Sequence, residues 1–265
     1  MKHGNKTTLH GAALGAAVVI SVVACFPIVL LALRSLARGW YWPDLIPQTF
    51  SLRAWKYVFD SSSGIPEAML TSVAVALAVT VLSLCVSFPA ARTLALEEFR
   101  GKQLIILLLT FPVLAPPLAS AMGLHALFLR LGITDSVWGV ILVHVIPAAP
   151  YCTFMLMSSF ANFDTDWEAQ ARSLGASPGA VFLYVTLPAV APGMAVAAGF
   201  AFLVSWSQYL VTLLIGGGRV LTLPLLLVTM QQGGDTATAA AIAIVYLAPA
   251  MVVLTLVARF LKPVS

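Results

Sequence analysis

Six long apolar runs dominate the pattern of hydrophobic and polar positions along the chain. They cover residues 11–33, 68–91, 104–128, 136–160, 190–214 and 237–260. Each run is long enough to cross about 30 Å of hydrocarbon, which takes roughly 20 residues of α-helix. The pattern therefore predicts six transmembrane helices, joined by shorter polar segments and by one longer loop over residues 35–67.

Composition agrees with this pattern. The chain of 265 residues is 60% hydrophobic and only 9% charged, which leaves too little polar surface to cover a soluble globule. The first apolar run follows a basic tail, but it is too long for a signal peptide and reaches Arg34 without a small-residue cleavage site. We expect an all-α integral membrane protein, organised as one transmembrane domain over residues 1–265.

Basic residues predict the orientation, because Lys and Arg favour cytoplasmic loops. With an even number of spans, both termini lie on one side of the membrane. That side holds Lys2, Lys6, Arg92, Arg100, Lys102, Arg172, Arg259 and Lys262, against Arg130 and Arg219 in the short loops opposite. The longer loop adds Arg34, Arg38, Arg53 and Lys56 to the opposite side and narrows the margin to eight against six. Both termini are predicted to be cytoplasmic.

The predicted spans and the outer loop contain few reactive residues. Cys25, Cys85 and Cys152 lie inside spans without metal-type spacing, and we interpret them as buried apolar residues. Prolines in the third and fourth spans predict kinks. Aromatic residues at positions 40–42, 55 and 57 suit the membrane–water interface, with a contact surface for an extracytoplasmic partner as the alternative.

The segment 161–189, between the fourth and fifth spans, has the pattern of two short helices joined by a turn. Thr165 and Glu168 have the spacing of a capping box. Glu168 and Arg172 form an i,i+4 pair, and an apolar face is made by Trp167, Ala171 and Leu174. This predicts a short amphipathic helix.

The second half of the segment supplies the turn and the next helix. Gly175 can adopt the left-handed conformation that ends a helix. Ser177 and Pro178 provide an N-cap and a first-turn proline, and Leu187-Pro188 is expected to end the second helix before the fifth span. Such a unit can dock on a soluble partner and pass its movement to the spans, or lie along the membrane surface. The physical pattern alone leaves both interpretations open.

The segment resembles the EAA loop of binding-protein-dependent ABC importer permeases. That motif reads Glu-Ala-Ala, three residues, Gly, nine residues, an aliphatic residue, any residue and Leu-Pro. Gly175, Val185 and Leu187-Pro188 match it in register, and Leu174 to Ser177 also resemble the family. The three front positions hold Ala169, Gln170 and Ala171, so the usual Glu is an Ala, and Glu168 lies one position earlier as a substitute.

The resemblance extends over nearly the whole chain. Residues 51–55 resemble the segment before the family's core helices, and Gly216 to Gly218 with Thr222-Leu223-Pro224 resemble its last outer loop. The chain is most similar to the second permease of the spermidine/putrescine-type group, which includes iron(III), thiamine and phosphonate importers.

This resemblance implies a type I ABC importer permease fold in an inner membrane. The implied partners are two ABC ATPase subunits that bind ATP and Mg, a second permease that is a different chain, an extracytoplasmic binding protein and lipid, with no nucleic acid. The chain itself is expected to bind no cofactor or metal and to be no enzyme. The residues that the resemblance assigns to ATPase coupling are Trp167, Glu168, Ala169, Gln170, Ala171, Arg172, Leu174, Gly175, Ser177, Val185, Leu187 and Pro188.

A candidate solute path lies in the fifth span. At 100° per residue, a continuous helix places Ser205, Gln208, Tyr209 and Thr212 on one polar stripe. Such a stripe either faces a water-filled path or bonds to neighbouring helices. We favour the path, because the family's translocation route is lined by this helix.

Two other classes of protein fit the sequence less well. An intramembrane serine protease is disfavoured because all histidines (His3, His10, His125 and His144) precede Ser177 and no later helix supplies a base. His125 and His144 are interpreted as packing residues. A self-contained secondary transporter typically needs an intramembrane carboxylate, and no predicted span contains Asp or Glu. The absence of such an acid also counts modestly against a polyamine as the solute. A self-contained transporter or a membrane scaffold remains the alternative, and the chain has no phosphate-binding loop for ATP.

Overall fold

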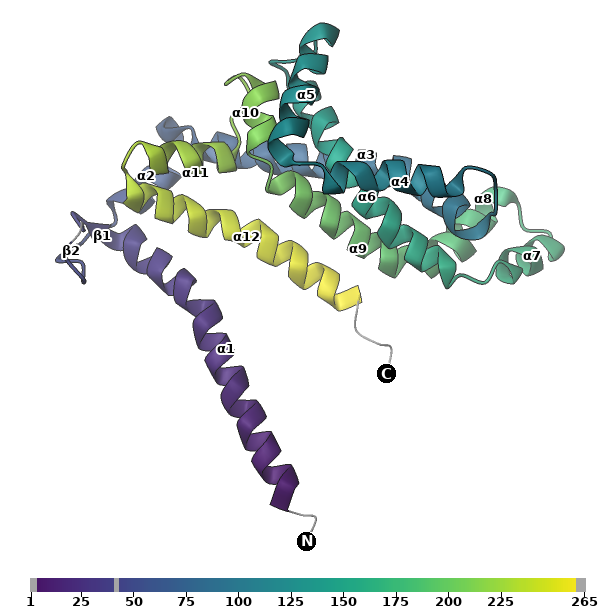
Figure 1. Ribbon diagram of the computed structural model, residues 1–265, viewed down its shortest axis with the longest axis horizontal. Helices are drawn as coiled ribbons and strands as arrows, with labels where there is room; N and C mark the ends of the chain where they lie inside the picture. The colour runs from purple at the N-terminus through teal and green to yellow at the C-terminus, as the bar shows by residue number, and fades with distance from the viewer. Residues whose placement is uncertain (1–3, 41–42, 261–265) are drawn as a thin grey trace. The chain divides into compact units, whose positions relative to one another are not determined.

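The structure is a computed structural model that describes residues 4–40 and 43–260, with side chains described from residue 19 onward. The chain is mostly helical, as the apolar runs predict (Figure 1). The longer helices are α1 (Gly4–Leu36), α3 (Ile65–Leu96), α4 (Lys102–Leu114), α5 (Pro117–Leu131), α6 (Val137–Ala161), α9 (Leu187–Trp206), α11 (Leu223–Gln232) and α12 (Thr236–Phe260). The shorter elements are α2 (Arg53–Phe59), the 3-10 helix η1 (Ser61–Ser63), α7 (Asp166–Ser173), α8 (Pro178–Val181), the π-helical turn η2 (Phe182–Thr186), α10 (Leu210–Gly216), β1 (Ala37–Arg38) and β2 (Thr49–Phe50).

The membrane-spanning helices largely follow the predicted runs. Among the described residues, five segments are long and apolar enough to cross a membrane: Val19–Leu36, Ile65–Leu96, Val137–Ala161, Pro178–Trp206 and Thr236–Phe260. The predicted third span is a bent pair: α4 and α5 meet at 105° and make a sixth span if the pair is counted as one. Ala115, between them, is extended because it precedes Pro116, and proline disfavours helix in the residue before it. The kink expected there is a full break.

The fifth predicted span is displaced along the chain. Its helix begins at Pro178, well before the predicted start at residue 190, and ends at Trp206. The next helix, α10, starts only at Leu210, so the polar residues Ser205 to Thr212 do not share one continuous helix. The single stripe predicted from 100° per residue is therefore wrong, because the chain turns at residues 207–209.

Contacts divide the chain into two compact units, one of residues 1–66 with 227–248 and the other of residues 67–226 with 249–265. We call these unit 1 and unit 2. The core of unit 2 is built around α6 and α9, which lie side by side (Figure 1). Gly193 permits this close approach, since a Cβ atom at that position would overlap the hydroxyl of Ser159 on α6. Larger buried side chains around the pair include Leu156 and Phe160.

Unit 1 contains the outer loop predicted over residues 35–67. Strands β1 and β2 pair antiparallel, with Ala37 opposite Phe50. Trp55 on α2 donates its indole N–H to the hydroxyl of Ser35 at 3.1 Å, which holds α2 against the end of α1. Tyr41 and Trp42, two of the predicted interfacial aromatics, lie outside the described residues.

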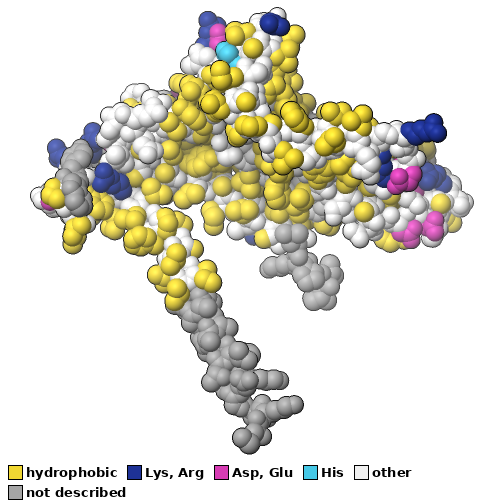
Figure 2. All heavy atoms as spheres, viewed as in Figure 1, with side chains coloured by type: hydrophobic (Ala, Val, Ile, Leu, Met, Phe, Trp, Pro, Cys, Tyr) yellow, Lys and Arg dark blue, Asp and Glu magenta, His cyan; other side chains and the backbone are white. Residues whose placement is uncertain are grey.

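Apolar side chains cover much of the surface of unit 2, as expected for helices that face lipid or a partner helix. Figure 2 shows them along the helices of unit 2, with charged side chains gathered around α7 and α8 and at the tips of α5 and α10. Cys25 in unit 1 and Cys85 in unit 2 are exposed, so their predicted burial is wrong, whereas Cys152 is buried as predicted. Within the described part of the chain, no three His, Cys, Asp or Glu residues are grouped closely enough to hold a metal ion.

Candidate coupling loop and solute path

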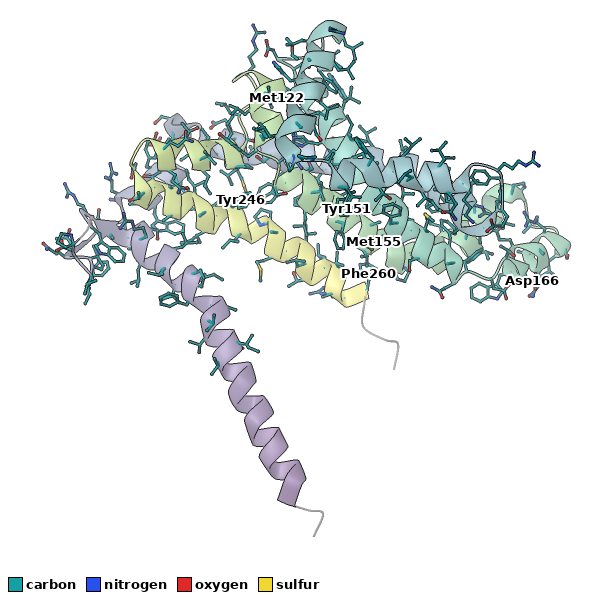
Figure 3. All side chains as sticks on the ribbon, in the orientation of Figure 1. Met122, Tyr151, Met155, Asp166, Tyr246 and Phe260 are labelled. Atoms are coloured by element: carbon teal, nitrogen blue, oxygen red, sulfur yellow. The ribbon has the colours of Figure 1, made fainter. Side chains whose placement is uncertain are left out.

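The segment between α6 and α9 begins with the turn into α7. Phe163 is buried, and the carboxylate of Asp164 accepts a hydrogen bond from the backbone N–H of Asp166 at 2.9 Å. Thr165 has helical backbone angles, and its side chain makes no capping bond to the described residues. The predicted capping box is therefore wrong: Asp164 serves the turn, and the side chain of Glu168 points elsewhere. Figure 3 places Asp166 at the α7 end of unit 2, away from Met122 on α5.

The turn after α7 has the predicted geometry. Gly175 has φ +87°, the left-handed conformation expected at this position. The backbone N–H of Ala176 donates to the carbonyl of Ala171 at 3.1 Å, which closes the end of the helix. Ser177 then caps α8, because its hydroxyl accepts a hydrogen bond from the N–H of Ala180 at 3.3 Å. Both local predictions are confirmed.

The second short helix does not end at Leu187-Pro188. Instead, α8 continues through a π-helical turn, Phe182–Thr186, directly into α9. The N–H of Leu187 donates to the carbonyl of Phe182, five residues back. A wider turn of this kind makes room where the ring of Pro188 would otherwise clash with the preceding turn. The second short helix of the segment and the fifth span are thus one helix, Pro178–Trp206, contrary to the prediction.

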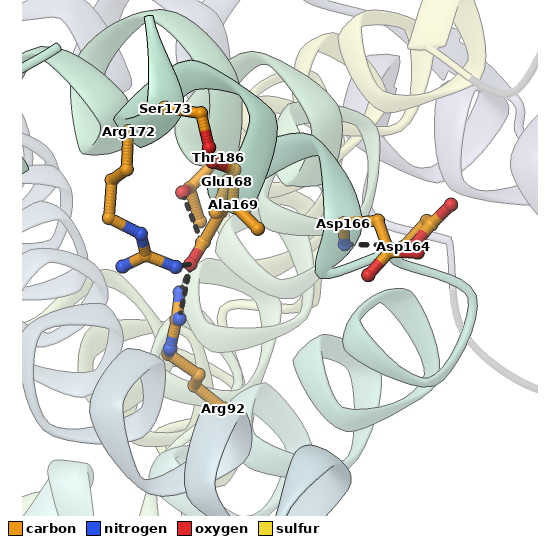
Figure 4. A network of polar contacts seen from close by, with 8 residues as sticks. All are labelled: Arg92, Asp164, Asp166, Glu168, Ala169, Arg172, Ser173 and Thr186. Atoms are coloured by element: carbon orange, nitrogen blue, oxygen red, sulfur yellow. Dashed lines mark hydrogen bonds and ion pairs between the residues drawn. The ribbon is translucent and has the colours of Figure 1, made fainter. Parts of the chain in front are cut away.

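The carboxylate of Glu168 is the centre of a polar network (Figure 4). The guanidinium of Arg92, on α3, donates to its two oxygens at 2.7 and 2.8 Å. The hydroxyl of Thr186, in the π-helical turn, donates to the same carboxylate at 2.6 Å. Arg172 lies farther away, at 3.5 Å, so the predicted i,i+4 pair exists but is the weaker contact. One side chain therefore joins α7 to both α3 and the start of α9.

The carboxylate at the centre of this network is buried, which strengthens its interactions with the surrounding charges. The side chain of Glu168 is only 4% exposed, whereas that of Arg92 is 36% exposed. The hydrogen bonds from Arg92, together with that from Thr186 and the charge of Arg172, outweigh burial and lower the pKa of Glu168 to about 2. Glu168 is therefore ionised at neutral pH and faces inward.

The outward face of α7 is a different set of residues. Trp167 is 50% exposed, with its ring edge-on to Phe163, and Leu174 is 90% exposed. A shallow hollow is lined by Asp166, Ala169, Gln170, Ser173 and Leu174. Of the residues predicted to couple to an ATPase, Ala169, Gln170 and Leu174 therefore lie at the surface of this hollow, while Glu168 does not. Val185 is half-buried in the π-helical turn.

The four predicted path residues separate into two groups. Ser205 and Thr212 are buried, and their hydroxyls lie 2.9 Å from the two ring nitrogens of His144 on α6. These two residues thus bond to a neighbouring helix, the alternative to a path. Gln208 and Tyr209 are half-buried in the turn between α9 and α10, and Gln208 lines a cavity of about 670 Å³.

Both helix breaks of unit 2 meet at this cavity. Ala115 and Pro117 line it from the break between α4 and α5, and Ser207 and Gln208 line it from the break between α9 and α10. Tyr151 on α6 adds a phenol. None of the described residues that line the cavity carries a charge. Broken helices at a cavity are a common way for transport proteins to expose polar backbone groups inside the membrane.

Comparison with known proteins identifies the family. The family model described as "Binding-protein-dependent transport system inner membrane component" matches residues 98–264. The chain belongs to this family. It is therefore the permease of a binding-protein-dependent ABC importer, a multi-pass inner-membrane component, and ATP hydrolysis belongs to a separate subunit.

Individual relatives support the assignment. The permease is 28% identical over 239 residues to the spermidine/putrescine permease PotC of Haemophilus influenzae, covering 89% of this chain and 92% of that protein. It is 30% identical over 253 residues to the molybdenum permease ModB of Mycobacterium bovis, covering 90% of each. A solved bacterial ABC transporter involved in alginate import contains a chain with the same fold, at a TM-score of 0.74, 16% identity and 99% coverage of both chains.

Two important residues of the permease were missed in the sequence. Arg92 counted only as a cytoplasmic charge, because its partner Glu168 lies 76 residues away and nothing local links them. His144 was interpreted as a packing residue, and its burial agrees, but its bonds to both sides of the α9–α10 break were not foreseen. His125 is half-buried on α5, and the side chains of His3 and His10 lie outside those described.

Proposed function

We propose that this permease couples ATP hydrolysis to solute movement through the loop over residues 161–189. The observation that carries the proposal is the two-sided character of α7. Its inward face is fixed by the buried carboxylate of Glu168, and its outward face presents Leu174, 90% exposed, beside the hollow at Ala169 and Gln170. An exposed apolar side chain on a firmly held helix is suited to enter a groove of a soluble protein.

The partners follow from this arrangement and from the family. In the proposed assembly, two ABC ATPase subunits hold ATP and Mg, a second permease of different sequence completes the membrane domain, and an extracytoplasmic binding protein delivers the solute. This chain binds no cofactor. Both termini and the 161–189 loop face the cytoplasm, as the distribution of Lys and Arg predicts. The whole chain of 265 residues acts as one transmembrane domain.

The proposed mechanism is alternating access. ATP binding draws the ATPase subunits together, the α7 helices of the two permeases follow, and the spans open outward to receive solute. Hydrolysis resets the cycle. In this mechanism Gln208 and Tyr209, at the α9–α10 break, are the path residues, while Ser205 and Thr212 hold the break in place through His144.

The solute is proposed to be small and polar, of the polyamine, phosphonate, thiamine or iron(III) type. The names of the relatives include a polyamine, molybdenum and, for the trehalose permease SugB of Mycobacterium tuberculosis, a sugar, so they do not select one class. The described lining of the cavity at the helix breaks carries no charge, so it offers no ion pair that would select a solute of one sign. Selectivity then rests mainly with the binding protein.

The coupling proposal is tested by replacing Leu174 with Asp and purifying the permease from its native membrane in mild detergent. Because a charge cannot enter an apolar groove without a partner, we expect the ATPase to be lost from the complex. The matched control is Gln103→Asp, which adds the same charge at an exposed position in the first turn of α4, where an acid is favourable. Equal recovery of ATPase with both variants would refute the docking role of α7.

A further inference from the structure

Unit 1 contains a polar cavity of its own. Its volume is about 520 Å³, and it is formed where the first span ends, around β1, the start of α2 and the turn before α12. Three arginines line it: Arg34, Arg38 and Arg53. Neither the coupling mechanism nor the solute path uses this cavity.

The first arginine is held rigidly. The Nε of Arg34 donates to the hydroxyl of Thr236 at 3.1 Å, and its Nη1 donates to the carbonyl of Trp40 at 2.8 Å. The guanidinium also lies over the ring of Trp40, 5.2 Å from the centroid. A guanidinium has five N–H donors, and these contacts fix its plane while using two of them. Arg34 is thus a pre-organised donor at the cavity wall.

The cavity carries an excess of positive charge. Asp235 is the single acid among the described residues that line it, so three arginines and one aspartate give a net charge of +2. Asp235 is already committed: Arg53 donates to it at 2.8 Å, and the N–H and hydroxyl of Thr238 donate to it at 3.1 and 2.8 Å. The N-terminal residues of α12, Thr236 and Ala237, add the positive end of a 25-residue helix.

We propose that this cavity binds the phosphate group of an anionic phospholipid. Arginine is suited to phosphate because its planar fork offers two parallel hydrogen bonds to two oxygens. The net charge of +2 favours a headgroup with a net negative charge and disfavours, by comparison, a zwitterionic headgroup.

The surroundings of the cavity favour lipid over a soluble phosphate. Arg34 lies in the last turn of the first span, whose side chains Val29, Leu30 and Leu33 are 53%, 39% and 39% exposed. A lipid with its phosphate in the cavity can lay its acyl chains along this apolar surface. The nearby loop also exposes large apolar side chains, including Ile46 and Phe50, which are suited to the headgroup region of a membrane. From the end of the span and these exposed apolar side chains, we expect the cavity to lie near the level of the lipid phosphates.

The test uses the complete importer, purified in mild detergent and examined by native mass spectrometry with added phosphatidylglycerol or phosphatidylcholine. We expect phosphatidylglycerol to be retained preferentially. Arg38→Gln, at an exposed position, should weaken this retention about fivefold, the usual effect of one basic residue near an anionic lipid surface. Arg34→Gln should weaken it at least as much. Arg219→Gln, an exposed arginine of unit 2, is the matched control and should leave retention unchanged.

Three outcomes would overturn the proposal. Equal retention of phosphatidylglycerol by the wild type and both cavity variants would mean that the lipid binds elsewhere. Displacement of the lipid by millimolar inorganic phosphate, with phosphate itself retained, would make the ligand a soluble anion. Unchanged lipid retention with weaker capture of the binding protein by Arg38→Gln would assign the arginines to protein docking. Because ATPase recovery depends on α7, it should be unaffected by either variant, which separates this test from that of the coupling loop.

Discussion

Replacement of Arg92 by Gln should release the inward side of α7. In the wild-type permease the Arg92 guanidinium holds both oxygens of Glu168 at 2.7 and 2.8 Å, and the carboxylate is only 4% exposed. The variant leaves this buried charge with Thr186 and with Arg172, whose side chain is 55% exposed and 3.5 Å away. Removing one partner of a buried ion pair is costly because the other charge stays desolvated.

The size of the effect follows from the network. The pKa of Glu168 is lowered from 4.5 to about 2, which corresponds to about 3 kcal/mol in favour of the ionised form. Arg92 is the largest cause of this shift, so most of that free energy should be lost in the variant. An opening free energy lower by about 3 kcal/mol means that α7 opens roughly a hundred times more often.

The pH dependence distinguishes this ion pair from a general packing defect. Because the pKa of Glu168 is lower in the folded state, the ionised carboxylate stabilises the fold fully above pH 4.5. This stabilisation is lost only as the pH falls toward 2. The wild type should therefore behave alike at pH 7.5 and pH 5.5. Without Arg92, the pKa of Glu168 should rise, because the largest cause of its lowering is lost while burial still disfavours the charged form. Protonation then relieves the buried charge, and the defect should be smaller at pH 5.5 than at pH 7.5.

Amide hydrogen exchange over residues 166–173, in the assembled importer in lipid nanodiscs, measures the opening of α7. Protection factors, corrected for intrinsic exchange at each pH, should fall about a hundredfold in Arg92→Gln at pH 7.5. Solute transported per ATP hydrolysed should fall in parallel. Arg100→Gln, at an exposed position beyond the end of α3, is the matched control. If exchange over α7 stays within threefold of the wild type, or if the defect does not shrink at pH 5.5, the network does not hold the helix.

Two further predictions concern the packing of unit 2. Replacement of His144 by Leu should lower the thermal unfolding temperature of the detergent-solubilised complex, because it leaves the buried hydroxyl of Ser205 without its partner, at a cost of about 1–3 kcal/mol. Combining it with Ser205→Ala should recover part of this loss. If the effects of the two changes simply add, the two side chains are not in contact. Gly193→Ala should prevent the close approach of α6 and α9, because its Cβ would overlap the hydroxyl of Ser159. The yield of monodisperse complex in size-exclusion chromatography should therefore fall. The second change Ser159→Gly should restore the yield, and failure to do so would show that the overlap is not the cause.

The spans were predictable because each apolar run has to bury its backbone polar groups in a helix inside a membrane. The breaks were predictable only where the cause is local. Pro116 and Pro117 follow the end of α4 and act on their immediate neighbours. The break at residues 207–209 contains no proline or glycine, so its sequence suggests a continuous helix. It is accompanied by the bonds of His144 to Ser205 and Thr212, on either side of it, and such tertiary contacts are not visible in a local pattern.

In the loop over residues 161–189, too, only the features with a local cause were predictable. Gly175 and Ser177 were predicted correctly because backbone conformation and helix capping depend on neighbouring residues. Glu168 was misjudged for the opposite reason. Its spacing from Thr165 fits a capping box, but its carboxylate instead meets Arg92, which a local rule does not consider. A buried ion pair with two hydrogen bonds stabilises the fold more than a single capping bond does, because water can bond to the free N–H groups at a helix end instead.

The position of Glu168 has a mechanical consequence for coupling. A short helix joined to its neighbours only by the turns at either end would move with little effect on the spans, because turns bend easily. Here Arg92 links the middle of α7 to α3, and Thr186 links it to the π-helical turn that continues into α9. A push on Leu174 from a soluble partner would therefore reach two spans through one carboxylate. Because α8, the π-helical turn and α9 form a single helix of 29 residues, any tilt imposed at Thr186 is carried toward the break at residues 207–209, where Gln208 lines the cavity.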